Sequence, residues 1–325
     1  MGTFKPAYEF NMESKTFAEK AFGPEKDEFL KTAAQAVTLF VQDQIREDGF
    51  ARKVVDTRNV SPADLVEVTW TDQPVMIAYH DVDTVAMTVP LRGRGQYRYY
   101  ETAKFEIVFE KITSETIKKN KMEMLKSRIN YLDIFKKRIA QRMYQVEDMT
   151  VISGANKILE DEWNEANNNN TVKDTDNYKA SKQNIQFKSG VTLDKESLVE
   201  FFKLPTQNKS EIRRVLLTNT LLQDIIKMSM LEVGDANVSK LWNEGVDSIK
   251  SFWGKQIVTT IKNEIVPDNK IYGFAGGDLY GWFFILRDHV VYMETERDVL
   301  SIDADAYVAH AVGNTKGVYV AEFAE

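Results

Sequence analysis

One long stretch of the chain lacks the two residues that most often interrupt regular structure. No glycine or proline occurs between Gly95 and Gly154, and these two residue types are the strongest local breakers of helices and strands. Within the stretch, apolar residues recur at steps of three and four, which predicts one apolar stripe along a helix. The stripe runs through Ile117, Leu125, Ile129, Leu132, Phe135, Ile139, Met143 and Val146.

The expected ends of this helix also have local signals. Thr113 and Ser114 are good N-cap residues, and Gly154 is a good residue just past the last turn. A helix over Ser114–Ser153 would be about 60 Å long, more than the diameter of a small domain. We interpret it as a spine helix that supports a broad, flat domain. Two helices meeting at a kink, or a coiled coil without strict heptads, are the alternatives.

Composition excludes several classes of protein. The 325 residues allow one large or two medium domains, and the 43% hydrophobic content is enough for a core. The net charge of −7 argues against a general affinity for nucleic-acid phosphates. The chain has no cysteine, which excludes disulfides, thiolate metal sites and a cysteine nucleophile. No apolar run is long enough for a signal peptide or a transmembrane helix.

The N-terminal region divides into an arm and a helix. Residues 1–22 are predicted to be an arm, because Phe4, Tyr8 and Phe10 lie among charges and fit no single helix face. An arm with this many aromatic residues is expected to lie on a neighbouring surface. Pro24–Asp48 is predicted to be a helix that Gly49 ends. Its acidic polar face disfavours the alternative of a membrane-surface helix.

Residues 54–112 are predicted to be rich in β-structure. Apolar residues alternate with polar ones at both ends of the segment, through Val66, Val68 and Trp70 and again near Phe105. Between these ends lie the tip residues Arg92 and Arg94, flanked by Gly93 and Gly95, followed by Arg98 and Tyr99. We interpret the segment as a long two-stranded excursion. A long isolated hairpin is marginal in water, so a partner surface is expected.

The rest of the chain is predicted to be mixed α/β. The asparagine-rich residues 161–189 are expected to form a surface loop or flap. A helix over Asp194–Lys203 is expected to end near Pro205. A strand over Arg214–Leu217 then leads into a helix from Leu221. Core strands are expected within 257–261 and 271–292. The chain is predicted to close with Ala306–Ala311 and Val318–Phe323 as a hairpin-like pair in one sheet.

No motif with catalytic or metal-binding chemistry was found. His80, His289 and His310 are not spaced as metal ligands, and each is expected to be structural. Asp303 and Asp305 could bind a cation, but a solvated loop is the commoner arrangement for two carboxylates. No phosphate-binding loop or nucleophile motif occurs. We therefore expect no enzyme activity and no cofactor.

The order of these elements resembles the major capsid proteins of tailed bacteriophages, whose fold is shared with encapsulin shells. The residues that carry the resemblance are Ala86–Gly95 as the extended loop, Phe105–Ile112 running into the spine helix, Val215–Leu222 as a strand-to-helix step, and Tyr307–Phe323 as closing strands. The resemblance covers nearly the whole chain as an order of elements. It implies an α+β fold with an N-terminal arm, an extended β-loop, a long spine helix in a peripheral domain and a mixed α/β axial domain.

The resemblance also implies a division of the chain. Residues 1–48 would form the arm and first helix, 49–112 the extended loop with adjoining strands, and 113–190 the spine helix with the polar insert. Residues 191–300 would form the axial domain, and 301–325 the closing peripheral strands.

The resemblance further implies a subunit of an icosahedral head that encloses DNA, assembled from hexamers and pentamers in the host bacterial cytoplasm. The arm and the loop would contact neighbouring copies, so candidate contact residues are Phe4, Tyr8, Phe10, Arg92, Arg94, Arg98 and Tyr99. The expected partners are other copies, a separate scaffolding protein (since the chain begins at Met1), a portal and possible decoration proteins. Packaged DNA would lie near the inner surface without sequence-specific binding, and no membrane is expected.

Two other functions remain open at this point. The first alternative is an encapsulin-like nanocompartment shell. The second is an α+β metabolic enzyme, which a deep pocket with convergent ionisable groups would favour.

Overall fold

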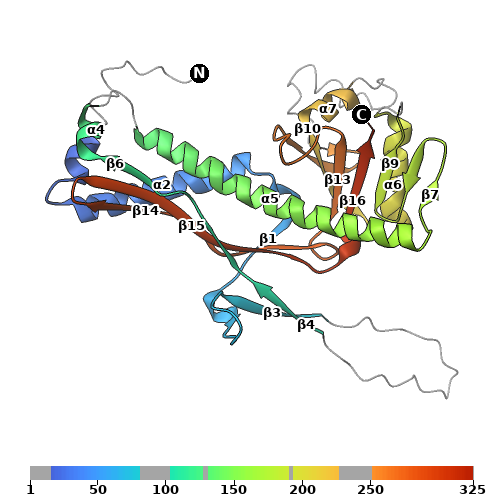
Figure 1. Cartoon of the computed structure of the whole chain (residues 1–325), viewed down its shortest axis with the longest axis horizontal. Helices are drawn as coiled ribbons and strands as arrows, with labels where there is room; N and C mark the ends of the chain where they lie inside the picture. The colour runs from blue at the N-terminus through green and yellow to red at the C-terminus, as the bar shows by residue number, and fades with distance from the viewer. Residues whose placement is uncertain (1–15, 81–102, 127–130, 190–192, 227–250, 325) are drawn as a thin grey trace.

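A long β-ribbon with two helices along it joins a larger sheet at one end (Figure 1). The computed structural model describes residues 16–80, 103–126, 131–189, 193–226 and 251–324. The ribbon is β14 (Gly281–Glu296) paired antiparallel with β15 (Val299–Val312). Three short strands complete this five-stranded sheet: β1 (Asp56–Asn59), β5 (Glu110–Thr113) and β6 (Ile117–Asn120).

Helices cover the ribbon and bury the largest core. They are α2 (Lys26–Asp48), the short α3 (Ala51–Val54), α4 (Lys121–Lys126) and α5 (Tyr131–Asn168). Val37, Val41 and Ile45 of α2 are buried at helical spacing against the same core as Ile139 and Met143 of α5. Burial of this apolar surface is the main force that holds the helices on the ribbon.

The second sheet has eight strands in the order β11-β12-β10-β13-β16-β9-β8-β7. Its strands are β7 (Lys173–Asp174), β8 (Tyr178–Ala180), β9 (Asn184–Phe187), β10 (Ile212–Thr218), β11 (Ser251–Phe252), β12 (Lys255–Thr260), β13 (Lys270–Ala275) and β16 (Val318–Phe323). Helices α6 (Lys195–Gln207) and α7 (Asn219–Ile226) pack on it around a second core.

A small third sheet projects from the ribbon (Figure 1). It consists of β2 (Leu65–Val66), β3 (Val75–His80) and β4 (Ala103–Val108), with a 3-10 turn at Pro62–Asp64 before it. Strands β3 and β4 pair antiparallel, as expected for the two arms of an excursion. The predicted strand does not reach Val68 or Trp70, which lie outside any strand.

The spine helix exists, but its predicted bounds are wrong at both ends. Residues before it form β6, which pairs with β15 through Ile117 opposite Ile302. Ser114 is no helix cap: its hydroxyl accepts a hydrogen bond from the Ala304 N–H at 2.9 Å, between β5 and β6. A stretch without Gly and Pro can form a strand as well as a helix. Residues 117–120 form a strand because they can pair with the free edge of β15.

Gly154 does not end the helix, because α5 continues to Asn168. A Cβ atom at Gly154 would lie 3.1 Å from Nδ1 of His310. The glycine therefore allows the helix to pass close to β15.

Three other predictions need correction. Residues 16–21 of the predicted arm are helical, with Ala18 and Ala21 buried and Phe17 packed on Phe29. The predicted polar flap is the end of α5 followed by β7, β8 and β9, because buried Ile185 and Phe187 anchor that segment to the second core. Helix α6 does not stop before Pro205, which lies inside it, while Asp194 caps its start as a capping box.

The predicted closing hairpin is also wrong. Strand β15 pairs with β14 in the ribbon, whereas β16 pairs with β13 and β9 in the eight-stranded sheet. The short connection between β15 and β16 would allow a hairpin, but each strand instead pairs with core strands from elsewhere in the chain. The predicted segments 191–300 and 301–325 therefore each contribute strands to both of these sheets. The five-part division of the chain itself stays a prediction.

Candidate assembly surfaces

The candidate contact residues chosen from the sequence lie outside the described residues. This holds for Phe4, Tyr8 and Phe10 of the arm and for Arg92, Arg94, Arg98 and Tyr99 of the excursion. Their roles therefore stay predictions. The structure instead describes the root of the excursion, from which residues 81–102 continue.

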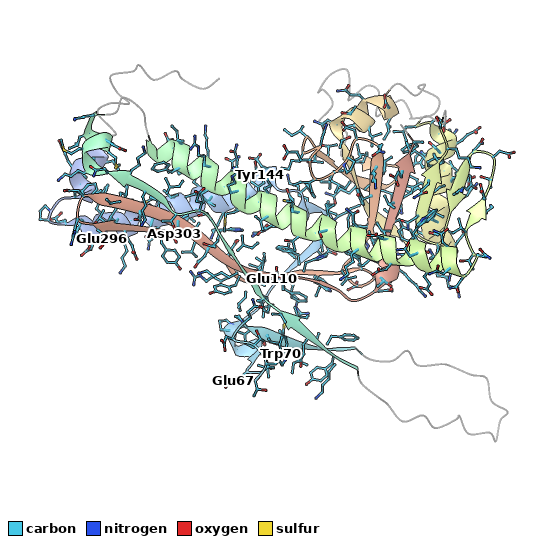
Figure 2. All side chains as sticks on the ribbon, in the orientation of Figure 1. Glu67, Trp70, Glu110, Tyr144, Glu296 and Asp303 are labelled. Carbon is cyan, nitrogen blue, oxygen red and sulfur yellow. The ribbon has the colours of Figure 1, made fainter. Side chains whose placement is uncertain are left out.

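The root of the excursion exposes large aromatic side chains. Trp70, Tyr79 and Phe105 are 61%, 62% and 53% exposed. Figure 2 shows Trp70 on the projecting small sheet, and its Nε1 donates a hydrogen bond to Oε2 of Glu106 at 3.1 Å. The ammonium of Lys104 lies 5.7 Å from the centre of the Tyr79 ring. Tyr79 pairs with Lys104, the residue before Phe105 in β4, so Tyr79 and Phe105 lie on opposite faces of the small sheet. Aromatic residues are enriched at protein interfaces, and both faces of the root therefore carry candidate contact residues.

Sequence reasoning missed the exposure of these three side chains, although it named Trp70 and Phe105 as strand residues. The sequence pattern placed Phe105 in a strand of alternating apolar and polar residues. Ile107 and Phe109 are buried in a small core with Val60 and Phe284, but Phe105 lies beyond that core. The signal that could have identified the exposed group is aromatic residues at the end of a strand that continues into a loop.

A buried charge cluster fastens the helices to the ribbon. Arg52 of α3 forms a bidentate ion pair with Glu147 of α5, with N···O distances of 2.9 and 2.7 Å. Its guanidinium also donates a hydrogen bond to Oδ1 of Asp288 in β14 at 2.9 Å. The ring of His289 lies between the two carboxylates, with Nδ1 3.0 Å from Asp288 and Nε2 3.3 Å from Glu147. Glu147 and His289 are almost completely buried.

A bulge in β14 turns this cluster inward. Val290 pairs with Asp305 and Arg287 with Tyr307, so Asp288 and His289 together oppose one residue of β15. Burial raises the pKa of Asp288, but hydrogen bonds from His289 and Arg52 outweigh it and hold the pKa well below its usual value. Burial likewise lowers the pKa of Arg52, but its two carboxylate partners raise it above its usual value. This mutual pairing is typical of a structural network.

A second buried carboxylate fixes the start of α3. Oδ1 of Asp148 accepts hydrogen bonds from the N–H groups of Phe50 and Ala51, at 3.0 and 2.7 Å. Lys262 pairs with its other oxygen and lies 3.8 Å from the centre of the Tyr144 ring. Burial raises the pKa of Asp148, against the opposing effect of Lys262. The contact ties the loop after β12 to the spine helix.

Three other candidates for chemistry, Asp303, Asp305 and His310, lie in β15 of the ribbon. Asp303 and Asp305 lie within β15 rather than in a loop, and Asp305 is held by Arg287 at 2.7 Å and Lys111 at 3.2 Å. Nε2 of His310 is buried, and loss of contact with water lowers the pKa of His310 to about 4. Among the described ranges, no three His, Asp or Glu residues are grouped as metal ligands. No helix in the described part of the chain is long and apolar enough to cross a membrane.

Two large hollows in the described residues are open grooves. One, of about 1110 Å³, lies between α2 and β14. The other, of about 1040 Å³, lies between the middle of α5, the β5–β6 connection and residues 261–265. Neither groove includes the charge cluster around Arg52.

The architecture matches solved viral and virus-like shells. The chain is similar to the mature capsid of bacteriophage PhiM1 (TM-score 0.54, 7% identity, 86% of this chain and 88% of that one). It is also similar to the capsid of a native GTA particle (TM-score 0.51, 14% identity, 84% and 89%). A third match is a virus-like particle from Pyrococcus furiosus (TM-score 0.54, 10% identity, 90% and 98%).

The chain has the tailed-phage capsid fold. No family model matches the sequence, and no curated protein matches it. The evidence for the fold is therefore structural, and the predicted α+β architecture is confirmed. The similar structures named above are two capsids and a virus-like particle.

Proposed function

We propose that this chain is a major capsid protein that self-assembles as hexamers and pentamers into the icosahedral head of a tailed bacteriophage. One observation carries the proposal: the capsid fold extends over most of this chain and over most of each shell protein it matches. The aromatic root of the excursion supports it, because a subunit that worked alone would gain nothing from exposing Trp70, Tyr79 and Phe105.

The contacts between copies would come from the two projecting parts of the chain. Phe4, Tyr8 and Phe10 would pack on a neighbouring copy. Arg92, Arg94 and Arg98 would pair with carboxylates of another copy, since the planar guanidinium suits bidentate pairing. Tyr99 would extend the aromatic surface that begins at Tyr79.

The wider set of partners follows from the same function. A separate scaffolding protein, a portal and possible decoration proteins would act with the shell, and assembly would take place in the bacterial cytoplasm. Packaged double-stranded DNA would lie near the inner surface without sequence-specific binding, in keeping with the net charge of −7. No membrane takes part.

A nanocompartment shell of the encapsulin kind is the second candidate. The match to the virus-like particle favours it, because that match covers 98% of the particle's chain. The two candidates differ in content: a head holds genomic DNA, and a nanocompartment holds protein cargo.

The test is electron microscopy of particles purified from producing bacterial cells and treated with nuclease. A phage head is expected to appear as closed icosahedral shells with protected DNA of one length. Shells that hold only protein would favour the nanocompartment. A monomer or dimer in those cells and in the purified protein at every concentration would contradict both.

A further inference from the structure

The groove between α2 and β14 has an apolar lining and an acidic rim. Its apolar lining residues are Leu30, Ala34, Leu39, Val290, Val291 and Met293. Asp27, Glu28 and Glu294 add three negative charges and Lys31 one positive charge. Among the described residues, none of the three acids has an ion-pair partner. Leu39 is 64% exposed, so the groove is suited to an apolar ridge flanked by bases.

The exposed face of α5 provides such a ridge. Val146 and Met149, one helical turn apart, are 42% and 53% exposed. Arg138 and Arg142 continue the same face toward the start of the helix, and both are exposed. Neither arginine has an ion-pair partner in the part of the chain that the structure describes.

The two surfaces also match in spacing. Eleven residues separate Glu28 from Leu39 on α2, and eleven separate Arg138 from Met149 on α5. Each pair spans about 16 Å along its helix and returns to nearly the same face, because eleven residues complete about three turns. Parallel helices would therefore place the arginine at the glutamate and the methionine at the leucine.

We propose that the α5 ridge of one copy docks into the α2–β14 groove of a second copy. Within one copy the two helices already pack through other residues, such as Val37 and Ile139, so these outer faces are left for another molecule. The proposed contact buries apolar surface and pairs guanidinium groups with carboxylates. It deepens the proposed function, on which it rests, by naming an interface between shell subunits.

Engineered disulfides test the contact, because the chain has no cysteine of its own. The full-length L39C and M149C variants are mixed under mild oxidation and separated on a non-reducing gel. The expected result is a covalent dimer from this mixture and much less from L39C mixed with R138C, because Arg138 should lie about 16 Å from Leu39. No dimer from either mixture, or equal dimer from both, would overturn the proposal.

Charge reversal gives a second test that does not depend on cysteine geometry. Either R138E/R142E or D27R/E28R is expected to raise the protein concentration needed for association at least about tenfold, because like charges would face each other. A one-to-one mixture of the two variants restores opposite charges wherever unlike copies meet, and is expected to associate at a lower concentration than either variant alone. Failure of the mixture to recover, with both variants folded by circular dichroism, would contradict the pairing.

The outcomes separate this contact from the proposed function. Shells that form without the L39C–M149C disulfide would overturn the contact and leave the capsid function intact. The disulfide without shells in producing cells would support the contact and count against the capsid function.

Discussion

Two regions of the molecule differ in which side chains they bury. The junction of α3, α5 and β14 buries charged and polar groups, whereas the root of the excursion exposes aromatic groups. At the junction, the largely buried side chains of Arg52 and His289 both lie within 3.3 Å of the buried carboxylate of Glu147. At the root, Trp70 and Tyr79 are apolar side chains left in water. The first arrangement fixes the shape of one subunit. The second is unfavourable in a lone subunit and becomes favourable only when another surface covers it.

The largest expected effect comes from removing one member of the buried cluster. Glu147→Ala leaves Arg52 and His289 without their shared carboxylate in a buried site. Breaking a buried ion pair on one side costs about 3–5 kcal/mol, so the free energy of unfolding should fall by that amount in urea denaturation. The matched control is Glu160→Ala, an exposed glutamate on the same helix, which should change stability by about 0.5 kcal/mol or less. Equal small effects would show that the cluster does not hold the junction.

The next effect is a dependence of stability on pH through His310. Its folded pKa of about 4 lies below the ordinary value of 6.5. Between these values the unfolded chain binds the proton and the folded chain does not, so stability should fall as the pH drops from 6.5 to 4, by at most about 3 kcal/mol.

The measurement is urea denaturation at pH 7, 5 and 4 for the wild type and for His310→Gln. The difference between the two proteins isolates this residue from the other titrating groups. The wild type should lose stability relative to His310→Gln as the pH falls. A difference that stays constant with pH would contradict the assignment.

A smaller effect is expected where α5 passes β15. Gly154→Val places a side chain against the His310 ring, and such overpacking costs about 1–3 kcal/mol. Ser153→Val is the matched control, because its neighbouring position is exposed and carries the same β-branched cost in a helix. Thermal unfolding of both variants should show a larger loss at Gly154. The reverse order would mean that the helix does not lie close to the ribbon there.

The smallest effect on stability belongs to the root. Trp70→Ala removes an exposed ring and one hydrogen bond to Glu106, so the loss should be below about 1 kcal/mol. Phe109→Ala, from the buried core beneath the same sheet, should cost about 3–5 kcal/mol. A comparable loss at Trp70 would mean that its ring belongs to the fold of the subunit.

Local patterns in the sequence predicted elements better than their partners. The spacing of Phe135, Ile139 and Met143 identified the spine helix, since one face of it is buried on the ribbon. The boundary at β6 was missed because the residues around Ile117 and Lys119 fit a strand and a helix equally well, and only the free edge of β15 decides between them. The closing hairpin was wrong for the same kind of reason: β16 pairs with strands remote in sequence.

The charge cluster was partly within reach of sequence reasoning. Glu147 follows Met143 by four residues and therefore falls on the buried face of α5, where a glutamate needs a partner. Its partners, Arg52 and Asp288, lie far away in the chain, and a bulge in β14 turns Asp288 and His289 toward it. No local pattern specifies that bulge.

Sedimentation velocity of a variant with Trp70, Tyr79 and Phe105 all changed to serine shows whether the root of the excursion joins subunits. We expect a folded chain whose free energy of unfolding changes by about 1 kcal/mol or less. It should sediment as single subunits under conditions in which the wild type forms shells. Shells that form as readily as those of the wild type would show that the root does not join subunits. Loss of folding would show that the aromatic residues stabilise the subunit itself.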